Sequence, residues 1–281
     1  MKKKKRENIC VITGGTRGIG YSLVKKFVEK KFNVIVIGRK RKNFETGIKK
    51  FPSYERKKIL FYKFDLSEPT EFRELFNRLK KKKNIKILFN NAGAIFKKKI
   101  LNKKKLERTF TLNYLCPFYL TLNFAKFYKT NTKIQIINMT SFLRNFAKIN
   151  LSDVFFKKKY NPYLAYANSK LMNAFLTYEI NKRYAHKIKC YSYEPGFVNT
   201  NFGNDNKSFL RKFIKIIKFY FGRNPNDVAS EITSHLFSNK KRKLFYSYIN
   251  KNKIIDINKI VKDKSLSKNL FTMSKKLISQ S

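Results

Sequence analysis

The segment that decides the fold reads Asn8-Ile9-Cys10-Val11-Ile12-Thr13-Gly14-Gly15-Thr16-Arg17-Gly18-Ile19-Gly20. The apolar run over residues 8–13 predicts a buried strand, and the apolar spacing over Tyr21–Lys30 predicts a helix after the glycines. Gly14 permits a tight turn, while Gly18 and Gly20 let the backbone approach a pyrophosphate at the helix N-terminus. A strand, a glycine loop and a helix in this order predict a dinucleotide site.

Strands alternate with helices along the rest of the chain. Further apolar runs predict strands over Asn33–Ile37, Ile59–Phe64, Ile85–Phe89, Lys133–Asn138 and Ile188–Tyr193. Helical spacing predicts helices over Phe72–Leu79, Phe110–Phe127 and Ala165–Tyr184. This alternation predicts an α/β fold, a doubly wound, mostly parallel sheet with helices on both faces. Ligands of such sheets bind at the carboxyl ends of the strands.

Length and composition fit one folded unit. The chain has 281 residues, of which 42% are hydrophobic, which is enough for one large core. Because no linker rich in Pro, Gly and Ser interrupts it, we expect a single domain over residues 1–281.

The formal net charge of +48 is extreme. A charge of this size attracts polyanions, so nucleic acid and anionic membranes must be considered. Most basic runs fall between the periodic segments, which favours solvated surface over one binding groove. No nucleic-acid-binding signature accompanies them, so we expect no specific nucleic-acid partner. The runs are Lys2–Arg6, Lys80–Lys83, Lys97–Lys99, Lys103–Lys105, Lys157–Lys159 and Lys240–Lys243.

Cysteine usage and the N-terminus indicate a reducing compartment. Cys10, Cys116 and Cys190 are scattered, which argues against a disulfide framework and against a metal site. The apolar run Ile9–Ile12 is too short for a signal peptide, and no stretch approaches the roughly 20 apolar residues of a membrane span. We therefore expect a cytoplasmic protein.

A second motif, Tyr166-Ala167-Asn168-Ser169-Lys170, places a phenol and an ammonium one helical turn apart. A neighbouring cation favours the phenolate and lowers the pKa of the tyrosine. Such a tyrosine exchanges a proton with a carbonyl or alcohol oxygen near neutral pH.

The residues after the second predicted strand bear on cofactor choice. An NAD site has an acidic residue about 20 positions beyond the glycines, where this chain reads Gly38-Arg39-Lys40. Arg39 and Arg17 would flank a 2′-phosphate, which predicts NADP(H) in preference to NAD(H). The alternative is that basic residues stand there by chance in so basic a chain.

In these motifs the chain resembles the classical short-chain dehydrogenases/reductases, whose Rossmann fold matches the one expected here. The resemblance runs from end to end, and within the family the retinol dehydrogenase and protochlorophyllide reductase branch looks most similar. The family motifs are Thr13–Gly20, Asp65-Leu66, Asn90-Asn91-Ala92-Gly93, Asn113, Ser141, Tyr166-x-x-x-Lys170 and Pro195-Gly196. The branch rests on Leu112–Thr121, Ser169–Asn173, Pro195–Thr200 and Leu270–Leu277.

The resemblance implies four catalytic residues. Tyr166 would be the general acid in carbonyl reduction and the base in the reverse direction. Lys170 would lower the pKa of Tyr166 and bind the nicotinamide ribose. Ser141 would hydrogen-bond the substrate oxygen, and Asn113 would anchor a water that relays protons to Lys170.

The resemblance also implies the cofactor contacts. Asp65 would contact the adenine, the backbone near Asn91 would line the cofactor, and Thr200 would lie near the carboxamide. The complete expected set is Gly14, Thr16, Arg17, Gly18, Ile19, Gly20, Arg39, Asp65, Leu66, Asn91, Ala92, Gly93, Tyr166, Lys170, Pro195, Gly196, Val198 and Thr200. One departure is Glu194, which stands where the branch usually has His and leaves substrate details open.

The stretch Phe209–Phe221 has a broad apolar face opposite a basic one. It falls where the family places its substrate lid, expected here over 201–224, with a C-terminal extension over 240–281. An apolar lid predicts an apolar substrate. The same helix could lie on an anionic membrane as a peripheral contact or simply cover the core.

Together these features predict an NADP(H)-dependent oxidoreductase. It would interconvert a carbonyl and an alcohol on a retinoid-, steroid- or lipid-aldehyde-like substrate, as a monomer or homodimer. The alternatives are a catalytically idle, cofactor-sensing scaffold of the same fold, and a polyanion-binding protein that uses the charge.

Overall fold

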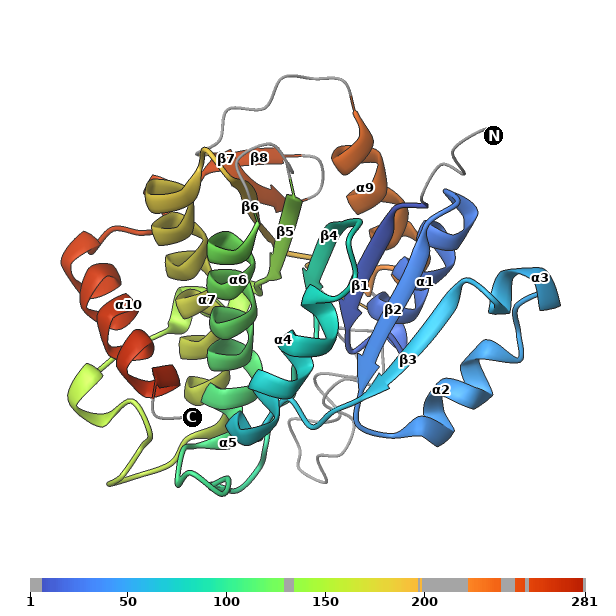
Figure 1. The fold of residues 1–281 in the computed structure, drawn as a ribbon. Helices are drawn as coiled ribbons and strands as arrows, with labels where there is room; N and C mark the ends of the chain where they lie inside the picture. Colours follow the sequence, from blue (N-terminus) through green and yellow to red (C-terminus); the bar gives the residue numbers. More distant parts are fainter. Residues whose placement is uncertain are drawn as a thin grey trace.

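A parallel sheet with one antiparallel edge strand organises the molecule (Figure 1). The structure is a computed structural model that describes residues 7–128, 134–196, 198, 222–238, 246–250 and 253–279. Within these residues the sheet has eight strands in the order β3-β2-β1-β4-β5-β6-β7-β8. Their bounds are β1 Ile9–Thr13, β2 Asn33–Gly38, β3 Ile59–Lys63, β4 Ile85–Asn90, β5 Ile134–Met139, β6 Ile188–Tyr193, β7 Tyr246–Asn250 and β8 Lys253–Asp256.

The expected doubly wound sheet is confirmed, and the six predicted strands agree with β1 to β6 to within one residue at each end. β7 and β8 were not predicted, because they are only five and four residues long and lie in a part of the sequence rich in lysine and asparagine. β7 pairs in parallel with β6, and β8 returns antiparallel beside β7. The region expected as a C-terminal extension therefore contributes two strands to the sheet.

The helices cover both faces of the sheet. In Figure 1, α4, α6 and α7 lie in front of it, while α1 and α9 lie behind it. The α-helices are α1 Gly18–Glu29, α2 Arg41–Ile48, α3 Ser53–Arg56, α4 Phe72–Lys80, α5 Arg108–Phe110, α6 Cys116–Phe127, α7 Pro162–Tyr184, α9 Pro225–Phe237 and α10 Lys264–Ser279. Shorter turns are η1 Pro69–Glu71, η2 Thr111–Leu115, η3 Phe142–Phe146, η4 Leu151–Asp153 and η5 Ile257–Lys259.

Two apolar clusters pack against the two faces. The larger joins α4, α6, α7 and α10 to the sheet, and the smaller joins α1 and α9 to it. The central strands are buried on both sides, so their sequences are continuously apolar and do not alternate. None of the helices in the described part of the chain combines the length and the apolar character that crossing a bilayer requires.

Strand order positions the site. β1 lies between β2 and β4, so the chain winds outward in opposite directions from this pair. The connections after β1 and β4 therefore diverge at the carboxyl ends and leave a crevice there, the usual ligand site of such sheets. The loops after β2, β5 and β6 begin at this same carboxyl edge of the sheet.

The predicted helix over 110–127 is not continuous. It consists of α5, the π-helical turn η2 and α6. A π-helical turn inserts an extra residue into the helical ladder, and such turns occur frequently at functional sites. Apolar periodicity does not reveal one inserted residue, so this turn could not be predicted from the sequence.

Two phenylalanines of α6 allow a matched test of the core. Phe118 is fully buried and packs on Phe271 of α10, whereas Phe127 is 49% exposed. We expect Phe118→Ala to lower the free energy of unfolding by about 3–5 kcal/mol, through lost burial and the cavity left behind. Phe127→Ala should cost about 1 kcal/mol or less. Urea unfolding would measure both, and equal losses would contradict this packing.

Candidate active site

The glycine loop leaves β1 after Thr13 and enters α1 at Gly18. Gly14 (φ 69°) and Gly18 (φ 55°) adopt the left-handed backbone that favours glycine. A Cβ at Gly20 would collide with the carbonyl oxygen of Gly14 and approach the side chain of Asn91. The first turn of α1 therefore presents bare backbone, which is what a phosphate group at a helix N-terminus needs.

Thr13 joins the ends of β1 and β4. Its hydroxyl donates to the carbonyl oxygen of Phe89 at 3.1 Å and accepts from the N–H groups of Asn91 and Ala92 at 3.0 Å each. The Asn91 amide in turn donates to the carbonyl oxygens of Thr13 (3.0 Å) and Gly14 (3.2 Å). Asn91 thus holds the glycine loop against β4. Thr13 was not among the predicted site residues, although a polar residue ending an apolar strand was the available signal.

Tyr166 and Lys170 lie one turn apart near the start of α7. Asn161 caps this helix by accepting hydrogen bonds from two backbone N–H groups of the first turn. Both side chains are buried, with 7% and 4% of their surface exposed. Lys170 Nζ lies 5.4 Å from the Tyr166 ring centre and donates to the carbonyl oxygen of Met139, the last residue of β5, at 3.0 Å.

Asn113 lies in the π-helical turn η2 and is fully buried. Its amide accepts from the N–H of Ala94 and donates to the carbonyl oxygen of the same residue, both at 2.9 Å. It also donates to Ser169 Oγ at 3.1 Å. A Cβ at Gly93 would lie 3.4 Å from Asn113 Oδ1 and 3.5 Å from Lys170 Nζ. The Asn91–Gly93 segment therefore passes directly beside two of the expected catalytic residues.

Ser141 follows β5 and caps the short turn η3. Its hydroxyl accepts from the N–H of Leu143 at 3.3 Å and forms a hydrogen bond with Tyr166. The four residues predicted to be catalytic thus come from η2, the end of β5 and α7. The structure brings all four together at the carboxyl edge.

The expected lowering of the Tyr166 pKa is wrong for these surroundings. Burial raises the pKa of Tyr166, and the hydrogen bond with Ser141 only partly opposes this rise. Burial also lowers the pKa of Lys170 to about 8. The physical reason is that the desolvation which disfavours the phenolate also disfavours the ammonium expected to stabilise it.

The predicted adenine end contains an ion-pair cluster. Asp65 Oδ2 lies 3.2 Å from Arg108 Nη2 and 3.8 Å from Arg39 Nη1. Asp65 Oδ1 accepts from the N–H and the hydroxyl of Ser67 at 3.0 and 2.6 Å. Arg39 remains 55% exposed, and Arg17, which precedes α1, is also exposed. Leu66 is buried in the core. Arg108 was missed, since nothing near it in the sequence marks it.

The loop after β6 is held by a residue far along the chain. Arg223 donates to the carbonyl oxygen of Pro195 at 3.2 Å and pairs with Glu231 of α9. Its backbone forms a parallel bridge with Val198, and its side chain lies beside Gly196. Sequence reasoning missed Arg223. Thr200, the expected carboxamide contact, lies outside the described residues, as do residues 201–221 of the expected lid.

Glu194, the departure from the family pattern, has a cationic partner. It is buried, and its Oε2 lies 3.4 Å from Nε of Arg144 in η3. This ion pair joins the end of β6 to the turn that Ser141 caps. This pairing could not be predicted from the sequence, because the two residues lie on different loops.

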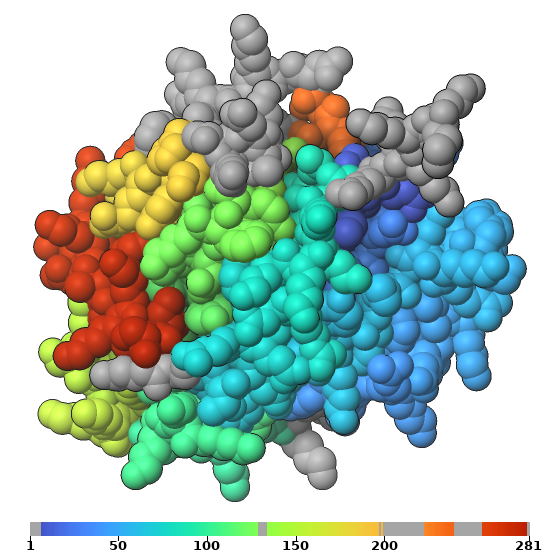
Figure 2. All heavy atoms as spheres, in the orientation of Figure 1, coloured from blue at the N-terminus to red at the C-terminus, as the bar shows by residue number. Residues whose placement is uncertain are grey.

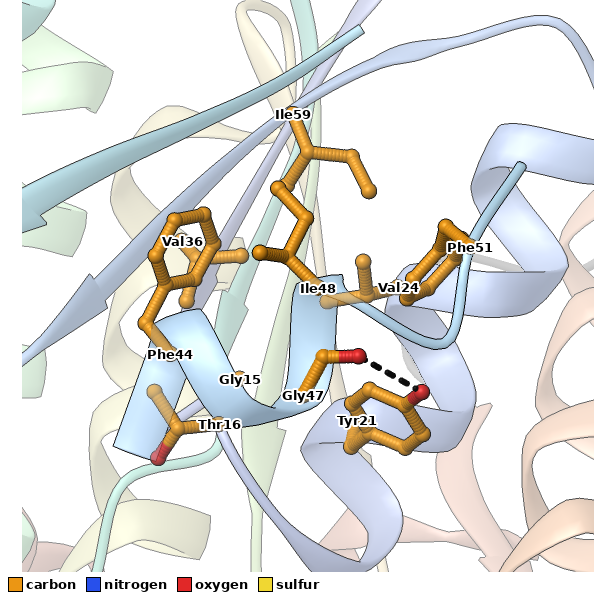
Figure 3. Close-up of a pocket in the computed structure, with 10 residues that line it drawn as sticks. All are labelled: Gly15, Thr16, Tyr21, Val24, Val36, Phe44, Gly47, Ile48, Phe51 and Ile59. Atoms are coloured by element: carbon orange, nitrogen blue, oxygen red, sulfur yellow. Dashed lines mark hydrogen bonds between the residues drawn. The ribbon is translucent and has the colours of Figure 1, made fainter. Parts of the chain in front are cut away.

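An apolar pocket backs the glycine loop (Figure 3). Its lining comes from the loop, α1, β2, α2 and β3, and the Tyr21 hydroxyl donates to the carbonyl oxygen of Gly47 at 3.1 Å. Thr16 lines this pocket, and Ile19 packs against the same apolar cluster. Tyr21 is the one titratable residue among those described as lining the pocket, and its hydrogen bond holds α1 against α2.

Comparisons with known proteins agree with this geometry. The family model described as short chain dehydrogenase matches residues 8–210. Human polyprenol dehydrogenase is 28% identical over 204 residues, which are 69% of this chain and 62% of that protein. Mouse retinol dehydrogenase 12 is 28% identical over 193 residues, 68% of this chain and 61% of that protein.

Among solved structures, an uncharacterized protein from Mycobacterium paratuberculosis superimposes with a TM-score of 0.73 at 20% identity. The match covers 97% of this chain and 93% of that one, and shows the shared fold. The chain belongs to the short-chain dehydrogenase family. Its match to the retinol and polyprenol dehydrogenases confirms the expected branch, although it spans less than two thirds of their length.

Thr13 offers a test of the link between β1 and β4. We expect Thr13→Val, which preserves shape, to lower the free energy of unfolding by about 1–3 kcal/mol, because the partly buried N–H groups of Asn91 and Ala92 lose their acceptor. Thr46→Val is the matched control, since Thr46 is exposed on α2 and its hydroxyl donates only to Lys42. Urea unfolding would measure both variants. A Thr13→Val protein as stable as the control would refute the link.

Proposed function

We propose that this protein is an NADP(H)-dependent oxidoreductase that interconverts a carbonyl and an alcohol on an apolar substrate. The observation that carries the proposal is the meeting of Tyr166, Lys170, Ser141 and Asn113 beside the glycine loop. These four residues come from three separate elements, so their convergence is a property of the fold.

The residues present fit a nicotinamide dinucleotide, the cofactor class that the family uses. Bare backbone at Gly18–Gly20 would hold the pyrophosphate. The segment Asn91–Gly93, fixed by Thr13, would line the centre of the cofactor. Pro195 and Gly196, held by Arg223, would pack on the nicotinamide. The bound cofactor would supply or accept the hydride.

The chain's own residues would handle the proton. Tyr166 would donate its phenolic proton to the carbonyl oxygen and recover it in the reverse direction. Because burial raises its pKa, the phenol is in the protonated form that reduction requires. Ser141, already bonded to Tyr166, would hold the substrate oxygen in line with it.

Lys170 and Asn113 would connect Tyr166 to a proton supply. A lysine with a pKa of about 8 changes protonation easily near neutral pH. Asn113 lies beside Gly93, and its side-chain amide donates a hydrogen bond to Ser169 on α7, the residue directly before Lys170. It would anchor the relaying water.

An apolar substrate is supported by the turn that Ser141 caps. η3 exposes Phe142 and Phe146, at 44% and 62% of their surface, next to the residue that would hold the reacting oxygen. The names of the relatives, polyprenol dehydrogenase and retinol dehydrogenase, point to substrates of the same character.

Tyr166→Phe tests the mechanism. Removing the phenolic oxygen should lower kcat for aldehyde reduction by at least about 100-fold, since Tyr166 is the group proposed to transfer the proton, while leaving NADPH binding largely intact. Tyr178→Phe is the control on the same helix, at a buried position in the core. NADPH oxidation with a panel of apolar aldehydes would be followed by absorbance. Unchanged turnover in Tyr166→Phe would refute the mechanism. If the unmodified protein bound NADPH but reduced none of the aldehydes, it would instead be a catalytically idle scaffold.

Arg39→Ala tests the cofactor preference. We expect the Kd for NADPH to rise by about tenfold and the Kd for NADH to stay unchanged, because only NADPH carries the 2′-phosphate. Arg78→Ala is the matched control, since Arg78 is 53% exposed against 55% for Arg39. Cofactor fluorescence would measure both constants. Equal effects of Arg39→Ala on the two cofactors would contradict a 2′-phosphate contact.

A further inference from the structure

We propose that the carboxyl edge of the sheet carries a docking surface for an anionic phospholipid membrane. The surface is a lysine rim, defined as Lys97–Lys99, Lys103–Lys105 and Lys157–Lys159. In sequence these are three of several basic runs and look like scattered surface charge. In the structure they lie together.

Two loops bring the runs together. The first follows β4 and contains Lys97–Lys99 and Lys103–Lys105, and the second precedes α7 and contains Lys157–Lys159. Lys99 Nζ donates to the carbonyl oxygen of Phe156 at 2.9 Å, and the Tyr160 hydroxyl donates to that of Phe96 at 2.9 Å. These two hydrogen bonds join the loops, and in each loop the bonded residues lie next to a lysine run. Figure 2 shows the two segments projecting along the lower edge of the molecule.

The charge on this rim is unbalanced. Eight of the nine lysines are exposed, and the ninth, Lys99, is partly buried against Phe156. Neither residues 94–106 nor residues 154–163 contain an acid. The acids at the border of the rim include Glu68, which accepts from the N–H of Lys103 at 3.2 Å, and Asp153, which accepts from the N–H of Lys157 at 2.5 Å, so the positive charges still outnumber them. Because hydrogen bonds join the two loops, the three lysine runs present their charges from one part of the surface and attract an anionic partner.

Exposed aliphatic side chains stand in the middle of the rim. Ile100 and Leu101, 39% and 49% exposed, separate the first two lysine runs. The tip that carries them is braced by bonds from Arg108 N–H to the Ile100 carbonyl oxygen and from Asn102 N–H to that of Leu106, both at 2.9 Å. A rigid tip with apolar side chains between lysines matches the boundary of a bilayer, where apolar groups enter the acyl region and cations meet headgroups.

This composition favours a lipid surface over nucleic acid. Nucleic-acid grooves combine cations with aromatic residues that stack on bases or with polar groups that read base edges. Ile100 and Leu101 can do neither. Moving their exposed side chains out of water is favourable when an apolar medium receives them. The chemistry of the rim therefore points to anionic phospholipid headgroups above acyl chains.

The position of the rim relates docking to the active site. The loop from β4 carries both Gly93, beside Lys170 and Asn113, and the first two lysine runs. Docking would turn the site entrance toward the membrane, so an apolar substrate could enter without crossing water. This consequence rests on the proposed function, whereas the docking itself does not.

Vesicle co-sedimentation of the full chain tests the proposal. The probes are vesicles of phosphatidylcholine alone and of phosphatidylcholine mixed with phosphatidylserine. The rim variant is Lys97→Gln/Lys98→Gln/Lys103→Gln/Lys104→Gln. The control variant, Lys57→Gln/Lys80→Gln/Lys81→Gln/Lys83→Gln, removes the same charge from the opposite edge, where β3 and β4 begin.

We expect the unmodified chain to bind the mixed vesicles and not the neutral ones. The rim variant should bind the mixed vesicles on the order of 600-fold more weakly, at roughly fivefold for each of the four lysines. The control variant should lose much less. Equal losses in the two variants would overturn the proposal, because net charge and not the rim would then drive binding.

A second variant tests the apolar part. Ile100→Ser/Leu101→Ser keeps every charge and should weaken vesicle binding at high salt by about tenfold, when electrostatic attraction is screened. Two results together would make the proposal wrong. They are vesicle binding by Ile100→Ser/Leu101→Ser that equals binding by the unmodified chain, and loss of single-stranded oligonucleotide binding by the rim variant. The rim would then be a nucleic-acid surface. Binding is measured without cofactor or substrate, so failure here leaves the oxidoreductase proposal standing.

Discussion

The structure depends on the hydrogen bonds that Thr13 makes where β1 and β4 end. At this point the chain winds outward in opposite directions, so the sheet leaves backbone groups of two neighbouring strands without strand partners. Thr13 and Asn91 satisfy those groups with each other. The crevice that results is lined by glycine backbone on one side and by residues 91–93 on the other. Both the proposed cofactor site and the catalytic residues border it.

Burial is the second constraint, and it sets the chemistry. Tyr166 and Lys170 are held out of water by α7 and the neighbouring loops, so the phenol keeps its proton and the amine holds its proton weakly. A cation beside a tyrosine stabilises the phenolate only as far as it is itself charged.

Loops far apart in sequence set the rest of the site. Arg144 of η3 contacts Glu194 after β6, and Arg223, at the end of the expected lid, contacts Pro195. Each arginine fixes a loop that carries an expected site residue, Ser141 in one case and Gly196 in the other. The lysine rim is likewise formed by two loops, which bring together charges that lie between Lys97 and Lys159 in the sequence.

The sequence alone predicted the fold class and the strands β1 to β6, because apolar periodicity and glycine spacing are local properties. The four residues expected to be catalytic came from the family resemblance of their motifs. The sequence could not predict the π-helical turn at Asn113, since one inserted residue leaves the apolar pattern unchanged. Strands β7 and β8 were also hidden, because they are short and gain their partners only from β6 and from each other. The Thr13 link, the Arg144 and Arg223 pairs and the raised pKa of Tyr166 were decided by tertiary structure alone. Hydrogen-bond partners and desolvation depend on which segments meet in space, and spacing along the chain does not record that.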